Sequence, residues 1–503
     1  MKRVRYEALI ALFIAVAAAV FQWGTIREGH NWGGDFAHYI LHARNIVEGQ
    51  SYSDTGYLYN PNNPFLAPPT YPPLFPLLLA GVYAVFGLHL SAMKALCILF
   101  FALALFTTFA MLRGRLPFRT RLAVVVVLGF NPFFWQFKDN ILSDSPFLFL
   151  CTLSLWLMQR TARDDLNSSR SGWPVCGVLC GVAMLLSYAT RSLGLVLPVC
   201  LIVHRIHRYG WLNRGAAVAV LTMAAGAVVE NLTLHRDGRY FDQLAVCLGG
   251  GEVVLDLLMN KATLWWGGLV SMWDNGLWAP LSSAVAAGAV MISCVGFVAV
   301  IRRDGWSVLE WFALAYLASV LLWPMGHDPR FLIPILPLHV AYAAVGIHSL
   351  GAMATRARFR IAIGALVILI VTGGYVARFA TLDYGAICGG ITSRNAVGLF
   401  EFVRQGTETT DVIVFIKPRV LALMTGRRSA AYHYGAGDEH LWQYIEQIRA
   451  THLISARWSA IDRHWLDAFV DRHQERFDLV YRDDDHRVHR VRRSDGATMG
   501  GRQ

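Results

Sequence analysis

The chain has 503 residues, of which 55% are hydrophobic and only 16% are charged, and its formal net charge is +11. An average soluble domain carries about 25% charged residues. Several stretches contain no charge over the ~20 residues that an apolar helix needs to cross a bilayer, among them residues 8–26, 277–301 and 331–355. The composition therefore excludes an ordinary soluble protein and predicts a polytopic α-helical membrane protein.

The positive charge is concentrated in short linkers between the apolar stretches. These linkers contain Lys2 to Arg5, Arg113 to Arg121, Arg205 to Arg214, Arg302 with Arg303, and Arg356 to Arg360. Such a distribution is the positive-inside signature of a membrane protein and not the basic patch of a nucleic-acid-binding protein. It predicts a cytoplasmic N-terminus. The segments expected outside the cytoplasm are residues 25–70, 138–144, the turn at Arg191, 231–276, 325–330 and everything after about residue 380.

The apolar runs, taken in chain order, predict about 11 to 13 transmembrane helices. The expected helices span residues 7–24, 71–88, 91–112, 121–137, 145–159, 172–190, 192–204, 214–230, 277–301, 308–324, 331–350 and 360–378. One segment conflicts with the charge pattern, because two full crossings between residues 71 and 112 would leave the Arg113 cluster outside. This segment requires an odd number of crossings, a re-entrant helix or different helix boundaries.

The composition of the sequence changes near residue 380, where charged residues become more frequent and long apolar runs stop. Short strands are expected at residues 411–416, 452–455 and 477–481, and amphipathic helices at 395–405, 438–449 and 463–474. Alternating strands and helices predict a small α/β domain. The expected domains are a transmembrane domain over residues 1–380, an extracytoplasmic α/β domain over 381–492 and a disordered tail over 493–503.

Asp35 is the acidic residue that most needs an explanation. It follows the first apolar span, and the segment after it is polar and aromatic up to Tyr71, which opens the next apolar run. An acidic residue held at the membrane face is costly unless it has a function. We therefore select Asp35 as a candidate catalytic residue, with Tyr71 as a supporting polar group.

Further polar residues fall on the same predicted face of the membrane. They are Lys138, Asp139, Asp144, Arg191, His327, Asp328 and Arg330. Arg191 and Arg330 are each flanked by apolar sequence, unlike the clustered cytoplasmic arginines. An isolated arginine at a membrane boundary commonly extends to lipid head groups, and this interpretation stays open for each of them alone. Two such arginines beside acidic residues on one face favour a phosphate-binding pocket with acid/base chemistry.

These residues occur in an order that resembles a known family. The segments are Gly34-Asp35-Phe36, Tyr71-Pro72-Pro73-Leu74-Phe75-Pro76, Ser143-Asp144-Ser145-Pro146, Ala189-Thr190-Arg191 and Asp328-Pro329-Arg330. Together they resemble the bacterial GT-C membrane glycosyltransferases, close to the protein O-mannosyltransferases and lipid A aminoarabinose transferases of glycosyltransferase families 39 and 83. The resemblance covers roughly residues 1–380. Lys417-Pro418-Arg419 and Thr425-Gly426-Arg427 also resemble the outer α/β domain of some relatives.

The resemblance implies a function and a set of roles. It implies an inverting glycosyltransferase of the inner (plasma) membrane that uses a polyprenyl-phosphate sugar donor and a hydroxyl acceptor in the cell envelope. Asp35 corresponds to the general base, and Arg191 and Arg330, with Lys138, correspond to donor-phosphate ligands. Asp144, Asp328, His327 and Tyr71 would support them. Phe36 stands where the protein O-mannosyltransferases have a second acid, which leaves a lipid, glycan or protein acceptor open.

Two other classes of function stay open at this point. A transporter or flippase would predict charged residues in the middle of helices and two related halves, and neither is evident. A membrane-anchored binding protein would leave Asp35, Arg191 and Arg330 unexplained. No cofactor is expected. A divalent cation stays open because aspartates and a histidine are near, although the sequence lacks a ligand spacing such as His-x-x-x-His at these positions.

Overall fold

The computed structural model describes residues 2–61, 63, 68–164, 173–234, 251–323, 328–353 and 357–492. The chain forms two compact units. The helical unit contains Met1–Arg27, Pro72–Phe75 and Ser91–Gly385, and the sheet unit contains Glu28–Tyr71, Pro76–Leu90 and Ala386–Gln503. The predicted division at residue 380 stays a prediction. The predicted tail over residues 493–503 lies outside the described residues.

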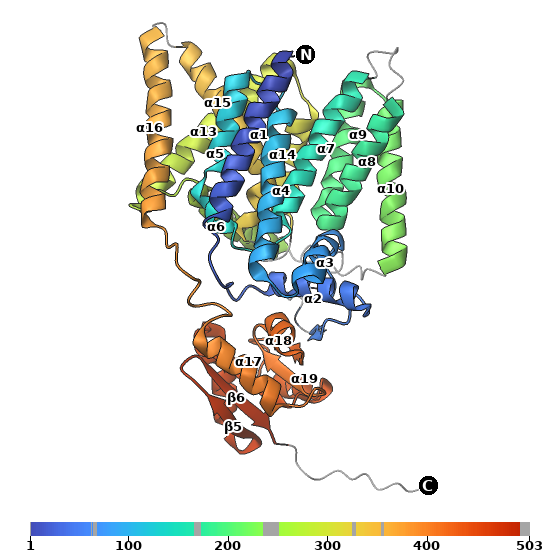
Figure 1. Cartoon of the computed structure of the whole chain (residues 1–503), viewed down its shortest axis with the longest axis vertical. Helices are drawn as coiled ribbons and strands as arrows, with labels where there is room; N and C mark the ends of the chain where they lie inside the picture. Colours follow the sequence, from blue (N-terminus) through green and yellow to red (C-terminus); the bar gives the residue numbers. More distant parts are fainter. Residues whose placement is uncertain are drawn as a thin grey trace. The chain divides into compact units, whose positions relative to one another are not determined.

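The helical unit consists of long helices joined by short connections. Its helices are α1 (Lys2–Trp23), α4 (Leu90–Met111), α5 (Phe118–Gly129), α6 (Pro132–Phe137), α7 (Asp144–Asp164), α8 (Trp173–Thr190), α9 (Val196–Tyr209), α10 (Arg214–Leu234), α12 (Gly251–Met272), α13 (Ala279–Asp304), α14 (Val308–Leu321), α15 (Leu336–Met353) and α16 (Ala357–Thr381). Two 3₁₀ turns, η1 (Ser192–Leu195) and η2 (Pro329–Ile335), precede α9 and α15. α7 packs against α8, and α8 packs against α10, so that these three helices run side by side (Figure 1).

The length and composition of these helices are those of a multi-pass membrane protein. Among the described residues, six helices are long and apolar enough to cross a membrane, and three shorter apolar helices accompany them. Much of their apolar surface is exposed, as on Leu221 in α10 and Ile361 in α16. Such a surface is stable in lipid and not in water. The predicted polytopic membrane fold is confirmed, and the number of crossings, 11 to 13, stays a prediction.

The length of helix α3 (Leu74–Phe86) bears on the conflict between the helix count and the charge pattern. It has 13 residues, which at 1.5 Å per residue is about 20 Å and less than the ~30 Å of a hydrocarbon core. α4 has 22 residues and is long enough to cross. One full crossing between residues 71 and 112 is therefore available, as the Arg113 cluster requires.

Three segments differ from the sequence-based expectation. The expected loop over residues 25–70 contains α2 (Gly34–Glu48) and a short strand, and the expected loop over 231–276 contains α12. The single helix expected over 121–137 is broken into α5 and α6. The break lies at Asn131, whose side chain accepts a hydrogen bond from the Phe133 amide at 2.8 Å and caps α6, with Pro132 in the first turn.

Close helix contacts in the helical unit depend on glycine. α13 and α15 pack together, and a Cβ atom on Gly296 would collide with the carbonyl oxygen of Tyr342. A Cβ atom on Gly346 would likewise collide with the carbonyl oxygen of Ile292. Small residues at such crossings let two backbones approach closely, which is how helices associate in a membrane without a hydrophobic driving force.

The sheet unit is built on one six-stranded sheet with the order β1-β3-β2-β4-β6-β5. The strands are β1 (Tyr57–Leu58), β2 (Val412–Phe415), β3 (Arg428–Ala430), β4 (His452–Ala456), β5 (Phe477–Arg482) and β6 (His486–Val491). β1, β3, β2 and β4 are parallel, whereas β6 pairs antiparallel with β4 and β5. The three strands expected from the sequence are confirmed as β2, β4 and β5.

Helices complete the sheet unit and cover its strands. They are α17 (Arg394–Gly406), α18 (Pro418–Thr425), α19 (Asp438–Gln447) and α20 (Asp467–Arg472). All four residues of β2 are buried, as expected of a central parallel strand. Residues of α19 and α20 form one core with strand residues such as Val414, Leu453 and Phe477. The expected helices at 395–405, 438–449 and 463–474 are confirmed, with a short π-helical turn at the start of the last.

Strand β1 attaches the first loop to the C-terminal sheet. Tyr57 and Leu58 pair in parallel with Ser429 and Ala430 of β3. The Asn60 amide donates a hydrogen bond of 3.1 Å to the carbonyl oxygen of Ala431, which extends this attachment. As a result α2, which precedes β1, packs against α18, which precedes β3.

Candidate active site

Asp35 lies in the first turn of α2. The helix begins after Gly33, whose backbone is extended, and Asp35 is the acidic residue of the opening turn. Unpaired amides and the helix dipole make this end of a helix favourable for a carboxylate. The Asp35 side chain is 22% exposed, so it is held in place and still accessible.

Two partners from distant parts of the chain hold the Asp35 carboxylate. The Tyr71 hydroxyl donates a hydrogen bond of 2.7 Å to Asp35 Oδ1. Arg419, at the start of α18, donates from NH1 to the same oxygen at 3.1 Å and to the Tyr71 hydroxyl at 2.6 Å. Burial alone would lower the pKa of Arg419, but its neighbours Tyr71 and Asp35 more than offset this and raise it. Asp35, Tyr71 and Arg419 therefore form one charge-assisted cluster, here called the Asp35 cluster.

Gly34 makes room for the Arg419 guanidinium. A Cβ atom at Gly34 would lie 2.5 Å from Arg419 NH2 and 3.0 Å from Cζ. Real side chains do not tolerate such distances, so any other residue at position 34 would displace the arginine. The glycine directly before the acid is thus required by the group that binds the acid.

Two buried histidines fix the loop that carries Tyr71. His42 bonds through Nδ1 to the carbonyl oxygen of Tyr52 at 2.7 Å, and its Nε2 accepts from the Tyr71 amide at 3.3 Å. Burial lowers the pKa of His42 to about 4, so the ring is neutral at pH 7. That state matches the contacts, because one ring nitrogen donates and the other accepts. His38 bonds to the carbonyl oxygen of Pro69 at 2.9 Å and packs on the Tyr71 ring.

The helical unit holds a second cluster around Asp144, here called the Asp144 cluster. Asp144 opens α7 and is 2% exposed, Arg191 follows α8 and is 14% exposed, and Arg330 lies in η2 and is 16% exposed. Arg191 NH1 donates to Asp144 Oδ1, and Arg330 NH1 lies 4.0 Å from Asp144 Oδ2. Two guanidinium groups therefore share one buried carboxylate, and the buried part of the cluster carries excess positive charge.

The ring of Phe331 and the carboxylate of Asp328 border the two arginines. The Arg191 and Arg330 guanidinium carbons lie 4.8 and 5.7 Å from the Phe331 ring centre. Asp328 caps η2 by accepting from the Arg330 amide at 3.1 Å. Its carboxylate lies 3.7 Å from Arg330 Nε but is 58% exposed, so water weakens its charge. The arrangement is chemically suited to an anion such as a phosphate. His327 lies outside the described residues.

Lys138 belongs to a different set of contacts. Its ammonium donates to Asp139 Oδ2 at 2.7 Å and lies 3.8 Å from the Trp135 ring centre. Asp139 also accepts from the Arg27 amide at 3.0 Å and lies 3.5 Å from the Lys94 ammonium. Asp139 thus lies against two buried ammonium groups, those of Lys138 and Lys94, and ties the segment after α1 to α4. The assignment of Lys138 to a donor phosphate stays a prediction.

The described residues offer little for a metal ion. They contain no group of three or more histidine, cysteine, aspartate or glutamate side chains close enough to hold one. The cysteines in this part of the chain are free thiols, most of them buried in helices.

Comparison with known proteins identifies the fold. The family model of dolichyl-phosphate-mannose-protein mannosyltransferases matches residues 70–232. No curated protein matches the sequence. Among solved structures, the oligosaccharyltransferase AglB from Archaeoglobus fulgidus, in complex with an inhibitory peptide and a dolichol-phosphate, has a TM-score of 0.58 and 13% identity over 90% of this chain and 69% of its own. ArnT from Cupriavidus metallidurans, bound to undecaprenyl phosphate, has a TM-score of 0.58 and 13% identity over 98% of this chain and 99% of its own. The chain has the fold of the GT-C superfamily of membrane glycosyltransferases.

Within this fold, the residues selected from the sequence fall into separate groups. Asp35 and Tyr71 meet in the sheet unit, and Asp144, Arg191, Arg330 and Asp328 meet in the helical unit. Their roles stay predictions.

Arg419 was not among the residues selected from the sequence, although it contacts the leading candidate. The available signal was the segment Lys417-Pro418-Arg419, which resembles the outer domain of GT-C relatives. Lys417 of the same segment is partly buried. This burial is the main cause that lowers the pKa of Lys417, and the nearby positive charge of Arg419 lowers it further. Without the β1–β3 pairing, nothing in the sequence connects this segment to Asp35.

Proposed function

We propose that this protein is an inverting glycosyltransferase. It transfers a sugar from a polyprenyl-phosphate donor to a hydroxyl acceptor in the cell envelope, at the extracytoplasmic face of the inner membrane. Asp35 is the general base. The observation that carries the proposal is the Asp35 cluster, in which a partly exposed carboxylate is held by Tyr71 and Arg419 in a chain with the GT-C fold.

The Asp35 carboxylate has the geometry that a general base needs. A hydroxyl acceptor is a weak nucleophile, so a carboxylate must take its proton as the oxygen attacks the anomeric carbon. Tyr71 and Arg419 both bond to Oδ1, which orients the carboxylate and stabilises its charged form. Attack from the side opposite the leaving phosphate inverts the anomeric carbon in one step. The C–O bond to the phosphate breaks as the new bond forms, and the proton goes to Asp35.

The Asp144 cluster has the chemistry that a leaving phosphate needs. The phosphate gains negative charge as its bond to the sugar breaks, and fixed guanidinium groups stabilise that charge most in the transition state. Arg191 and Arg330 are fixed by the buried carboxylate of Asp144 and by the Phe331 ring. We assign the donor phosphate to these two arginines.

The kind of donor is supported by the relatives. AglB was solved with a dolichol-phosphate and ArnT with undecaprenyl phosphate, and both ligands are polyprenyl-type phosphates. The family model over residues 70–232 describes transferases that use a dolichyl-phosphate sugar. We therefore propose a polyprenyl phosphate as the carrier of the sugar.

An in vitro transfer assay tests the proposal. The purified full-length protein is mixed with a panel of polyprenyl-phosphate sugars of known anomeric configuration and with envelope lipids, glycans or peptides as acceptors. We expect transfer from at least one donor, with a product of inverted configuration by NMR. A product of retained configuration would contradict direct displacement, and failure of every donor, with the protein folded, would contradict the proposed substrate class.

A further inference from the structure

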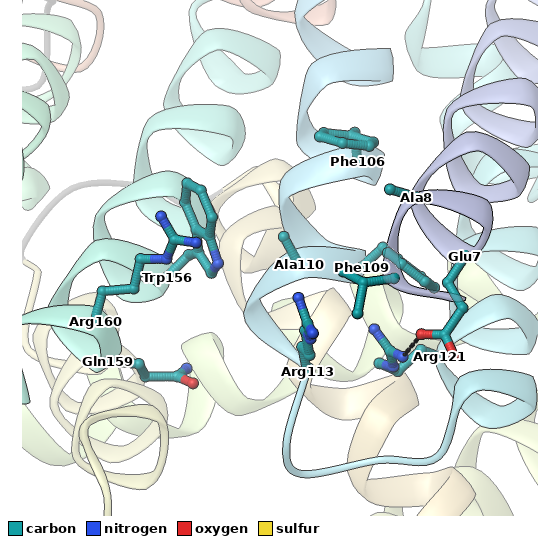
Figure 2. Close-up of a pocket in the computed structure, with 11 residues that line it drawn as sticks. Glu7, Ala8, Phe106, Phe109, Ala110, Arg113, Arg121, Trp156, Gln159 and Arg160 are labelled. Atoms are coloured by element: carbon teal, nitrogen blue, oxygen red, sulfur yellow. Dashed lines mark hydrogen bonds and ion pairs between the residues drawn. The ribbon is translucent and has the colours of Figure 1, made fainter. Parts of the chain in front are cut away.

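The helical unit contains a cavity of about 240 Å³ that the proposed reaction does not use. It lies between the beginning of α1, the end of α4, the beginning of α5 and the end of α7 (Figure 2). Its lining residues are Val4, Glu7, Ala8, Phe106, Phe109, Ala110, Arg113, Arg121, Trp156, Gln159 and Arg160. We call it the α1–α4–α7 cavity.

This cavity is distinct from the Asp144 cluster. Asp144 begins α7 and Arg160 lies near the end of that helix. Sixteen residues of helix separate them, which at 1.5 Å per residue is about 24 Å. A group bound in the cavity and one bound at Asp144 would therefore occupy opposite ends of the same helix.

The rim of the cavity carries positive charge. Three arginines and one glutamate line it. Arg121 donates to Glu7 at 2.8 Å and lies 4.3 Å from the Phe109 ring centre, so its charge is balanced. Arg160 lies 4.4 Å from the Trp156 ring centre, and Arg113 is exposed. Among the described residues, the Arg113 and Arg160 side chains make no hydrogen bond or ion pair, and two positive charges remain in excess.

The wall of the cavity is apolar and contains one polar group in need of a partner. The apolar lining residues include Val4, Ala8, Phe106 and Ala110. The Gln159 Nε2 amide is buried and makes no hydrogen bond within the described part of the chain. An amide left in that state costs free energy unless something accepts its hydrogen. The cavity thus offers an apolar wall, a buried donor and a basic rim to one ligand.

We propose that the α1–α4–α7 cavity binds an anionic phospholipid. The phosphodiester lies between Arg113 and Arg160, an ester oxygen accepts from Gln159, and an acyl chain follows the apolar wall. Basic pockets between transmembrane helices recognise anionic head groups in this way. The charge pattern of the linkers puts this end of the helices at the cytoplasmic leaflet, where anionic phospholipids are abundant. The apolar wall favours a phospholipid over free phosphate.

Native mass spectrometry of the intact protein tests this inference. The detergent-purified protein is titrated with phosphatidylglycerol, with phosphatidylcholine, with undecaprenyl phosphate and with inorganic phosphate. We expect retained phosphatidylglycerol and little phosphatidylcholine. In the double variant Arg113→Gln/Arg160→Gln the affinity for phosphatidylglycerol should fall about 30-fold, from the loss of two charges near the head group. Both side chains are exposed, so the variant should fold.

Two further variants distinguish binding in the α1–α4–α7 cavity from non-specific electrostatic attraction between the basic protein and anionic lipid. Arg119→Gln removes an exposed arginine in the first turn of α5 that does not line the cavity, and lipid binding should be unchanged. Ala110→Trp fills the apolar wall and should abolish retention with both arginines intact. Equal binding of phosphatidylcholine, an equal effect of Arg119→Gln, or full retention in Ala110→Trp would overturn the proposal. Preferential binding of undecaprenyl phosphate or inorganic phosphate would overturn the assigned ligand.

Discussion

Arg419 and Asp35 are separated by 384 positions in the sequence, and the guanidinium NH1 nitrogen lies 3.1 Å from the carboxylate Oδ1 oxygen. The pairing of β1 with β3 produces this contact, because it fixes α2 against α18. The same arginine also bonds to Tyr71 at 2.6 Å. The acid, its hydrogen-bond donor and its counter-ion are therefore all held within the sheet unit.

The first prediction concerns the glycine beside the acid. Gly34→Ala places a Cβ atom where the Arg419 guanidinium lies, 2.5 Å from NH2, so the arginine must move away from Asp35. We expect kcat for sugar transfer to fall roughly 10²-fold, as for other small displacements of catalytic groups. Gly81→Ala in α3 is the matched control, because a Cβ there meets nothing within 4 Å. Steady-state kinetics of both variants decide this, and equal activities would argue against a positioning role for Arg419.

The second prediction concerns acid stability. Burial lowers the pKa of His42 from 6.5 to about 4, so below pH 6.5 the unfolded state binds the proton more readily than the folded state. The contribution of neutral His42 to the free energy of unfolding is fully present above about pH 6.5. It is lost as the pH falls toward 4, because the unfolded state is then stabilised by protonation. His42→Gln should therefore flatten the pH dependence of sheet-unit protection in hydrogen exchange between pH 7 and 4. His440→Gln, at an exposed position, should keep the wild-type slope, and an unchanged slope in His42→Gln would contradict the account.

A third prediction separates a phosphate ligand from a lipid anchor at Arg330. Arg330→Lys keeps the positive charge but loses the planar guanidinium, whose parallel N–H donors fit two phosphate oxygens. Turnover at saturating donor should therefore fall in Arg330→Lys, and it should fall further in Arg330→Ala. An arginine that only extends to head groups would tolerate both changes. Turnover and donor KM are measured for both variants, with Arg404→Ala, an exposed arginine of α17, as control. Near-normal turnover in Arg330→Ala would remove this residue from the site.

The membrane topology is the fourth prediction. The distribution of the basic linkers predicts that the sheet unit lies outside the cytoplasm. A cysteine replacing the exposed His440, in a background without the native cysteines, should react with an impermeant thiol reagent in intact cells. Arg119→Cys in the basic linker should react only after lysis. The reverse pattern of labelling would show that the predicted orientation is inverted.

Much of the fold could be predicted because it depends on local patterns. Long apolar runs without charge predicted most of the membrane-spanning helices. Short apolar segments between turn residues predicted the strands at residues 411–416, 452–455 and 477–481. Strand β1 has only two residues and is defined by its pairing with β3, so no local pattern could reveal it. α2 was missed because its buried face includes His38 and His42, which interrupt the apolar periodicity.

The candidate site was predictable in part for the same reason. Asp35 stood out because an acid beside an apolar span is unusual, and Arg191 and Arg330 stood out because apolar sequence flanks them. Arg419 lies in the C-terminal region, where charge is higher than in the spans and an arginine is ordinary, and only the three-dimensional contact distinguishes it. Lys138 was selected because it lies on the same predicted membrane face, and in the structure its ammonium bonds to the adjacent Asp139.

The proposed transfer reaction depends above all on Asp35 as the base. Asp35→Asn keeps the size of the side chain and its hydrogen bonds to Tyr71 and Arg419 but cannot accept a proton. Asp54→Asn, at an exposed acid of the same segment, is the matched control. The decisive measurement is the turnover of the three purified proteins with one polyprenyl-phosphate sugar, with folding checked by thermal unfolding. We predict that Asp35→Asn loses about 10²–10⁴-fold in turnover while Asp54→Asn is unchanged. Wild-type turnover in a folded Asp35→Asn variant would contradict the assignment of Asp35 as the base.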